Sequence, residues 1–409
     1  METRNFNKTK RICYFTNLVM VSPFGLPPLL FATFRQMYGI SYTLLGTLVL
    51  INFCTQLGID LIFSFFSHRF NVHKTFRIMP LITALGLCVY ALVPMLLPEY
   101  AYAGLVIGTV IFSVAAGLEE VLMSSVVAAI PGSTDKDMST LHSLYGYGLI
   151  TVVSVSALFL RFAGDSNWMY LTLFWAVLPV IAALLMMRTP LPEMNTAQPT
   201  AATGRSRKRT GGLILCVLCI FLGSCTENTM SNWISAYAEK ALGIPKVWGD
   251  LSGMLLFAAL LALTRSAYAK FGKNILRIMM FSMIGTAACY LIAAFSPSAA
   301  ASLIACIALG ICTSMLWPGT LILMEEKLPA VGVAAYALMA AGGDLGASLA
   351  PQAFGLVVDQ VTVAQWAQDV SQTLALTPEQ LGFKVSLLMV AVCPLLGLLL
   401  LAYIKKFFK

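Results

Sequence analysis

The sequence predicts an all-α polytopic membrane protein with twelve transmembrane helices in two pseudo-symmetric bundles of six. Of its 409 residues, 59% are hydrophobic and only 11% are charged, and the mean hydropathy is +0.83. A soluble domain carries about 25% charged residues because its surface needs them. Apolar stretches long enough to cross a hydrocarbon core of about 30 Å also recur along the whole chain. Lipid must therefore cover most of this surface.

Most boundaries between the predicted spans carry charge or a helix breaker such as Gly39, Pro98 or Pro297. The first span is too long for a signal-peptide core, so we expect it to be retained. The twelve predicted spans are 12–34, 43–66, 75–97, 100–130, 138–162, 167–188, 212–238, 248–270, 274–296, 298–324, 331–358 and 380–404.

The longest interruption lies near the middle of the chain and divides it into two halves. Residues 189–210 are rich in Pro, Thr, Ala and basic side chains, which is typical of a flexible cytoplasmic linker. We therefore expect one six-helix bundle at 1–188 and a second at 211–409. Weak sequence similarity between the two halves supports a duplication. For example, Tyr38-Gly39-Ile40-Ser41 after span one resembles Leu242-Gly243-Ile244-Pro245 after span seven. Duplicated bundles of this kind are typical of secondary transporters.

The positive charges predict the orientation. Most Lys and Arg residues fall in the segments that share one side of the membrane with the N-terminus. The opposite side has only five, which are Arg35, Arg161, Lys240, Lys246 and Lys384. The positive-inside rule then predicts a multi-pass protein of the cytoplasmic (inner) membrane with both termini cytoplasmic. The net charge of +8 thus reports orientation, and no nucleic-acid partner is expected.

Span four contains two adjacent carboxyl groups. An acid at membrane depth costs about 3 kcal/mol unless it faces protein or water, so each one invites a functional interpretation. Glu120 shares a helical face with Ser113, Gly117 and Ser124, whereas Glu119 lies on a more apolar face. We therefore favour Glu120 as the cavity-facing acid. The alternative is a buried acid that serves helix packing.

Spans two and five carry further polar side chains. In span five, His142 and Tyr145 lie one turn apart, and the histidine is either a proton carrier or a structural hydrogen-bonding group. In span two, Asn52, Gln56 and Asp60 form a stripe at i, i+4 and i+8. Cavity lining and hydrogen bonding between helices explain this stripe equally well.

The second half of the chain has its own candidate binding residues. Span seven holds Glu227 and Asn228 near its middle, followed by Trp233, which could stack on a sugar ring or a planar ligand. In span eleven, Asp344 lies among glycines, whose density indicates close helix packing or a moving seam. Trp317-Pro318 in span ten predicts a kink.

No Lys or Arg is expected at mid-depth, because Arg161 and Arg265 are placed near span ends. The acidic set favours a protonatable site or a cationic group on the substrate, and it argues against a dedicated phosphate or carboxylate carrier.

Several other classes of protein are disfavoured. No GxxxxGK[ST] loop occurs, and no motif arranges Ser, His and Asp for hydrolysis, so neither ATP-driven transport nor enzyme activity is expected. The ten cysteines lie in apolar stretches, and the CxxC at Cys216 and Cys219 has no companion pair. We expect no catalytic residue, metal site or cofactor.

Several motifs together resemble the fucose permease-like branch of the major facilitator superfamily. The similarity is carried by Gly117-Leu118-Glu119-Glu120, by Leu141-His142, and by the glycine-rich stretch 342–346 with Pro351. The resemblance implies the major facilitator fold and a sugar or related polyol driven by a proton or sodium gradient. It also implies that the span-four glutamate and His142 line the cavity.

Two departures from that family pattern stand out. The loop after span two usually carries a Gly, then Asp-Arg, then Gly, whereas this chain has Ser64, His68-Arg69 and Asn71. The resemblance therefore implies an altered gating interaction at His68 and Arg69. In the proton-coupled sugar carriers an acid lies in span one, where this chain has Gly25-Leu26-Pro27-Pro28.

We therefore expect a secondary transporter, monomeric in the lipid bilayer, that moves a small-molecule substrate by alternating access with a coupling proton or sodium ion. One alternative is a proton-driven exporter of drugs or amphipathic metabolites, and another is a non-transporting membrane receptor. The proton-coupling candidates are Glu120, Glu119 and Glu227. The candidate substrate-binding residues are Glu120, His142, Tyr145, Glu227, Asn228, Trp233, Gln56 and Asp344.

Overall fold

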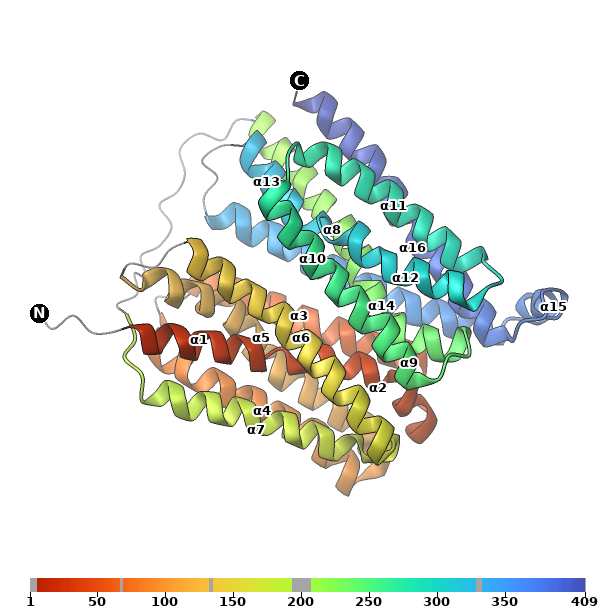
Figure 1. Cartoon of the computed structure of the whole chain (residues 1–409), viewed down its shortest axis with the longest axis horizontal. Helices are drawn as coiled ribbons and strands as arrows, with labels where there is room; N and C mark the ends of the chain where they lie inside the picture. Colours follow the sequence, from red (N-terminus) through yellow and green to blue (C-terminus); the bar gives the residue numbers. More distant parts are fainter. Residues whose placement is uncertain (1–5, 67–68, 132–134, 193–206, 329–332, 409) are drawn as a thin grey trace, which may run out of the picture. The chain divides into compact units, whose positions relative to one another are not determined.

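The computed structural model describes residues 6–66, 69–131, 135–192, 207–328 and 333–408, and the regular structure in these ranges is helical (Figure 1). By Cα proximity the chain divides into two compact units. Unit 1 comprises residues 1–33 and 54–198, and unit 2 comprises residues 34–53 and 199–409. Helices α2 and α3 therefore each continue from one unit into the other.

Unit 1 is built from the helices of the first half of the chain. In it, α4 packs against both α5 and α7, as the neighbouring ribbons of α4 and α7 show in Figure 1. The helices, including those shared with unit 2, are α1 (Asn7–Val19), α2 (Ser22–Tyr38), α3 (Tyr42–Phe66), α4 (Val72–Leu96), η2 (Pro98–Tyr100), α5 (Ala101–Ala129), α6 (Asp135–Ala163), η3 (Asp165–Asn167) and α7 (Trp168–Met187).

Unit 2 contains the remaining helices, among which α8 packs against both α14 and α16. Two of its segments are π-helical, η4 and η5. The helices are α8 (Arg207–Ala236), η4 (Tyr237–Ala241), α9 (Lys246–Gly249), η5 (Asp250–Leu255), α10 (Leu256–Phe271), α11 (Ile275–Phe295), α12 (Ala299–Thr313), α13 (Leu316–Lys327), α14 (Val333–Val363), α15 (Gln365–Thr373) and α16 (Pro378–Phe407).

The predicted spans agree with the observed helices to within a few residues. Among the described residues, eleven helical stretches are long and apolar enough to cross a membrane. The 31-residue α14 covers the remaining predicted span. The nine-residue α15, which lies between the last two spans, was not predicted. Its sequence is too short and too polar to register as a span.

Prolines interrupt two of the spans. Span ten is divided into α12 and α13, with the break at Ser314 and Met315 just before Pro318, so the predicted kink is confirmed. The first span is likewise divided, because α1 ends at Val19 and Pro23 lies four residues later. In both cases proline lacks the N–H that would bond the carbonyl four residues earlier.

Glycines let α14 approach the backbone of α8, as the glycine-rich stretch predicts. A Cβ added to Gly346 would overlap the carbonyl oxygen of Phe221, and one on Gly342 would lie 2.7 Å from a methyl carbon of Val217. Both clashes are with α8, so these glycines set the separation of the two helices.

The start of the predicted linker is bound to unit 1. The Thr9 hydroxyl donates to the carbonyl of Pro190 at 2.8 Å, and Arg77 donates to that of Thr189 at 3.2 Å. His73 Nε2 lies 3.0 Å from the carbonyl oxygen of Pro192. The rest of the linker up to residue 206 lies outside the described residues. The described part thus folds back on α1 and α4.

Candidate functional site

A polar, partly exposed face lies in the second half of α8 in unit 2. It is formed by Glu227, Asn228, Ser231 and Asn232, each of intermediate burial. The spacings from Glu227 to Ser231 and from Asn228 to Asn232 are both four residues, which aligns the two pairs along the helix. Four partly accessible polar side chains are unusual within a membrane-spanning helix. We call them the α8 polar face.

Arg265 of α10 neutralises the acid of this face. One guanidinium nitrogen, Nη2, donates to both carboxylate oxygens of Glu227, at 2.8 and 3.1 Å. The Arg265 side chain is 38% exposed and that of Glu227 is 17% exposed. A charge pair that is only partly desolvated at this depth indicates an aqueous opening or a ligand site beside it.

The break in span ten holds Arg265 in place. Pro318 cannot donate to the carbonyl of Ser314, which lies four residues earlier, so that oxygen is left without its helical partner. Arg265 Nε donates to this carbonyl oxygen at 2.9 Å. A discontinuous helix that presents backbone carbonyls at mid-span is a recurring way to build a transport site.

The expectation that no cation lies at mid-depth is therefore wrong. Arg265 was placed near a span end, but its side chain reaches Glu227 from inside α10, ahead of the helix end at Phe271. The sequence argument located each side chain by its position along its own helix. An arginine side chain is long, so its charge can lie about one helical turn away from the position of its own backbone.

Hydrogen bonds within α8 fix the amides of the polar face. Asn228 Nδ2 donates to the Ser224 hydroxyl at 3.0 Å, and Asn232 Nδ2 donates to the Asn228 carbonyl at 2.8 Å. The side-chain amide oxygens accept no hydrogen bond from the residues that the structure describes, so they can accept from a ligand. Asn228 was predicted from the sequence, whereas Ser231 and Asn232 were not. Their spacing of four from Glu227 and Asn228 was the available signal.

The other predicted residues of unit 2 lie in packed surroundings. Trp233 is 1% exposed, donates through Nε1 to the carbonyl of Pro351 at 3.0 Å, and stacks on Phe354 at 5.1 Å. Asp344 is 6% exposed within α14. Direct contact of Trp233 or Asp344 with a substrate stays a prediction, and it would require this packing to open.

In unit 1, the face predicted to line a cavity touches α3 at one point. A Cβ on Gly117 would lie 3.0 Å from the carbonyl oxygen of Gln56 and 3.1 Å from Asp60. Glu119 is buried at 8% exposure, and Gln56 at 3%. The side chain of Glu120 lies outside the described residues, so the choice between the two glutamates stays a prediction.

Span five and the loop after span two show only part of what was predicted. Tyr145 is 40% exposed, and its ring meets that of Phe24 edge-on at 6.0 Å. The side chain of His142 lies outside the description, as does His68 altogether. Arg69 is exposed, with its guanidinium 5.5 Å from the centre of the Phe66 ring. These contacts assign no structural role to the predicted gating residues His68 and Arg69.

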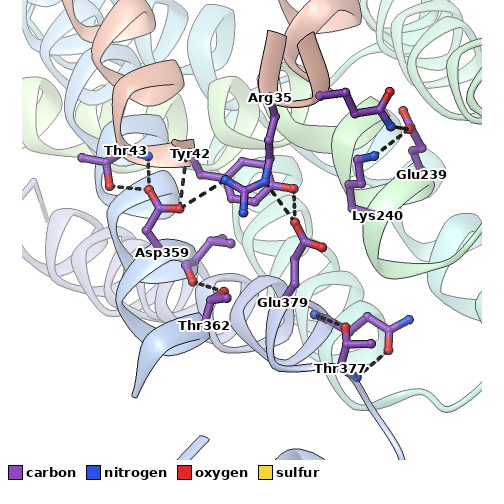
Figure 2. Close-up of polar contacts among 12 residues, drawn as sticks. Arg35, Tyr42, Thr43, Glu239, Lys240, Asp359, Thr362, Thr377 and Glu379 are labelled. Carbon is purple, nitrogen blue, oxygen red and sulfur yellow. Dashed lines mark hydrogen bonds and ion pairs between the residues drawn. The ribbon is translucent and has the colours of Figure 1, made fainter. Parts of the chain in front are cut away.

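A second polar cluster lies at the end of unit 2 that the charge pattern predicts to be non-cytoplasmic (Figure 2). Arg35 lies over the ring of Tyr42 at 4.1 Å, and its Nε donates to Glu379 at 3.2 Å. The Tyr42 hydroxyl donates to the same carboxylate at 2.7 Å. Arg35 is also 3.8 Å from a carboxylate oxygen of Asp359. We call this group the Arg35 cluster.

Asp359 of α14 caps the first turn of α3. Its carboxylate accepts from the backbone N–H of Tyr42 at 3.2 Å, and from both the N–H and the hydroxyl of Thr43 at 2.6 and 2.7 Å. An acid at a helix N-terminus satisfies unpaired N–H groups and interacts favourably with the helix dipole. Beside it, Glu239 pairs with Lys240 at 2.9 Å, as Figure 2 shows. The cluster holds residues 34–53 to unit 2.

These features define a class: a polytopic helical membrane protein with a charged, partly exposed site inside its spans and an ion-pair cluster at one end. A family model supports this class, because the model of the Major Facilitator Superfamily matches residues 12–351. The chain belongs to this superfamily, and the predicted fold is confirmed. It is therefore a member of a family of membrane transporters.

Solved structures with this fold include three transporters. A bacterial homologue of the human lysosomal transporter Spinster has a TM-score of 0.75 at 11% identity, covering 97% of this chain and 96% of its own. A D-xylose–proton symporter has 0.72 at 14%, covering 94% and 96%. The fucose:proton symporter of E. coli has 0.57 at 13%, covering 96% and 99%.

At these identities the likeness concerns the fold alone. The fucose symporter is no more similar in fold than the other two transporters. No curated protein matches the chain in a sequence comparison.

Proposed function

We propose that this protein is a secondary active transporter of a small polar solute, a sugar or a related compound, and that it works by alternating access coupled to a proton or sodium gradient. The α8 polar face carries this proposal. It combines a partly exposed charge pair with two amides and a hydroxyl in the second half of a spanning helix. Such a set can bind hydroxyl groups and one charge, which is the chemistry of a small polar solute.

The structural relatives support the same solute class. Their names describe a D-xylose–proton symporter, a fucose:proton symporter and a nucleoside transporter. In this proposal Glu227 and Asn228 contact the solute, and Glu120 or Glu119 in unit 1 provides a second protonatable group, with His142 on the following span as a further candidate. The protein acts as a monomer in the cytoplasmic membrane, with both termini cytoplasmic.

The rival function, export of amphipathic cations, requires an acid that is available to the cation. In unit 2 the Glu227 carboxylate is already occupied by Arg265. A cationic substrate would have to displace a guanidinium that makes two hydrogen bonds to that carboxylate. This requirement favours transport of a polar solute over export of a cation.

The test is uptake into proteoliposomes after a pH jump or a sodium jump, with a panel of labelled sugars, sugar acids and small cations. Glu120→Gln and Glu227→Gln are compared with Arg161→Gln, which removes an exposed arginine of α6 as a control. Gradient-driven uptake of a polar solute that Arg161→Gln preserves and Glu227→Gln abolishes is the expected result. Cation export against the proton gradient would favour the rival, and absence of all flux in folded protein would contradict transport.

A further inference from the structure

Building on the proposed function, we propose that the solute is a polyhydroxylated carboxylate of the sugar-acid class. In this proposal Arg265 binds its carboxylate, and Glu227 carries the proton that enters with it. The geometry of the α8 polar face and of the break in span ten points to this arrangement. The proposal reverses the expectation, drawn from an acidic set of mid-span residues, that a carboxylate carrier is disfavoured.

Arg265 has one edge that is already engaged and one that is open. Its Nε is bound to the Ser314 carbonyl, and its Nη2 is bound to Glu227. Its Nη1 makes no hydrogen bond to a residue in the part of the chain that the structure describes. The side chain is 38% exposed. A guanidinium held at two nitrogens and open at the third is preorganised for a carboxylate, its preferred partner.

The charge of the site argues for coupled binding. With Glu227 ionised, the pair is neutral, and a second carboxylate on Arg265 would lie against a like charge. A proton on Glu227 removes that repulsion and releases Arg265 for the solute. Proton and anion therefore each strengthen the binding of the other, because such coupling is reciprocal. Entry of a monoanion with one proton would move no net charge.

The other titratable groups near α8 are buried elsewhere or are bonded to residues other than Glu227. Asp250 of η5 accepts a hydrogen bond from Ser235, and the hydroxyl of Tyr290 on α11 donates to the carbonyl of Thr226 at 2.7 Å. Asp344 on α14 is buried, and Cys393 on α16 lies against Cys225. Among the described residues, Arg265 is the charged group in contact with the Glu227 carboxylate. We therefore assign the protonation event to this pair.

The rest of the polar face suits hydroxyl groups. The Nδ2 atoms of Asn228 and Asn232 are bonded within α8, and their amide oxygens accept from no other residue in the described ranges, so these oxygens can accept from a solute. Ser231 lies between them and adds a hydroxyl that can donate or accept. In a sugar acid, the hydroxyl groups follow the carboxylate along the carbon chain. On α8, the polar groups of Asn228, Ser231 and Asn232 likewise follow the site where Arg265 meets Glu227.

The first test measures the binding of D-gluconate to the full chain in detergent as a function of pH, with L-fucose as the neutral comparison. In the wild type we expect gluconate affinity to rise as pH falls. Glu227→Gln mimics the protonated acid, so its affinity should be high and independent of pH. Arg265→Gln should weaken gluconate binding by about 10- to 100-fold, the loss of a charge-assisted contact. Arg265→Lys should restore part of it, and Arg161→Gln should match the wild type.

The second test separates coupling from binding. In proteoliposomes, Glu227→Gln should still exchange gluconate for gluconate but should no longer accumulate it under a proton gradient. An unchanged pH slope in Glu227→Gln, or unchanged gluconate affinity in folded Arg265→Gln, would overturn the proposal. Accumulation of neutral sugars without gluconate would overturn it while leaving solute transport intact. Absence of flux for every solute would contradict transport itself.

Discussion

Pro318 illustrates how one residue without an N–H can build a site. It leaves the Ser314 carbonyl unbonded in its own helix, and Arg265 uses that oxygen at 2.9 Å. An arginine inside a span needs partners because a charge there costs about 3 kcal/mol or more when unpaired. The broken helix and Glu227 together supply them.

Restoring the missing donor should therefore weaken the site. Pro318→Ala supplies an N–H that competes with Arg265 for the Ser314 carbonyl. We expect solute affinity to fall by about three- to tenfold, the size of one ordinary hydrogen bond, while the helix itself becomes more regular. Pro179→Ala in α7 is the matched control, because no arginine among the described residues donates to the carbonyl of Trp175, four residues before that proline. Equal effects of the two substitutions on the Michaelis constant for uptake would argue against the role of Pro318.

Lys384 is a second residue whose charge has a structural use. Its ammonium group donates to the carbonyl of Ala294 at 3.0 Å and to that of Ser296 at 2.9 Å, at the C-terminal end of α11. Lys384→Met should lower the unfolding free energy by about 1.5 kcal/mol, the low end for hydrogen bonds from a charged donor, since the lysine is partly exposed. Thermal unfolding checks this against Lys406→Met, which removes an exposed lysine of the same helix. An equal melting temperature in the two variants would contradict it.

At this scale the sequence predicted Glu227 and Asn228 but not Arg265. An acid at mid-span is visible in the sequence because hydropathy makes it an exception. Its partner was hidden, because pairing depends on which helices are neighbours and on how far a long side chain reaches. The signal that could have found it was Pro318, whose position four residues after Ser314 marks an unbonded carbonyl near the middle of span ten.

At the scale of single helices, the seam between α14 and α8 depends on glycine. The stretch at 342–346 could be predicted as a close contact because glycine is otherwise unfavourable in a helix by about 1 kcal/mol. The identity of the facing helix could not be predicted, since it depends on the packing of the whole unit.

Substitution at this seam should be costly. Gly346→Ala places a methyl group against the Phe221 carbonyl, so we expect a loss of about 1–3 kcal/mol of stability. Gly58→Ala in α3 is the control, because nothing lies within 4 Å of its added Cβ. There the change should be neutral or should stabilise the helix by up to about 1 kcal/mol. Similar melting temperatures for the two variants would show that the seam can relax.

The first turn of α3 depends on a carboxylate from another helix. Asp359→Ala removes the acceptor for the N–H groups of Tyr42 and Thr43. Loss of such a cap should accelerate amide exchange in residues 42–46 by about tenfold. Hydrogen exchange with mass spectrometry measures this against Asp369→Ala in the exposed part of α15. Unchanged exchange at 42–46 would mean that Ser41 alone caps the helix, through the contact of its hydroxyl with the N–H of Leu44.

At the scale of the whole molecule, local sequence patterns predicted the transmembrane helices well. They predicted less completely which helices pack together in each unit. Spans are visible in the sequence because each must bury about 20 residues in lipid. The sequence divides the chain once, at its central linker, whereas residues 34–53 pack with unit 2. Their attachment depends on contacts such as Arg35 with Glu379, which are 344 residues apart, and no local pattern carries that information.

The most direct test of the account asks whether the α8 polar face meets water. In a chain whose ten native cysteines are replaced, Ser231→Cys is compared with Leu218→Cys, a side chain of the same helix that is 47% exposed on the apolar surface. The reagent is a charged, membrane-impermeant methanethiosulfonate, which reacts with thiolates formed in water. The account predicts fast reaction at position 231, slowed by the transported solute, and slow reaction at position 218. Inert thiols at both positions, or faster reaction at 218, would contradict the placement of a transport site on this face.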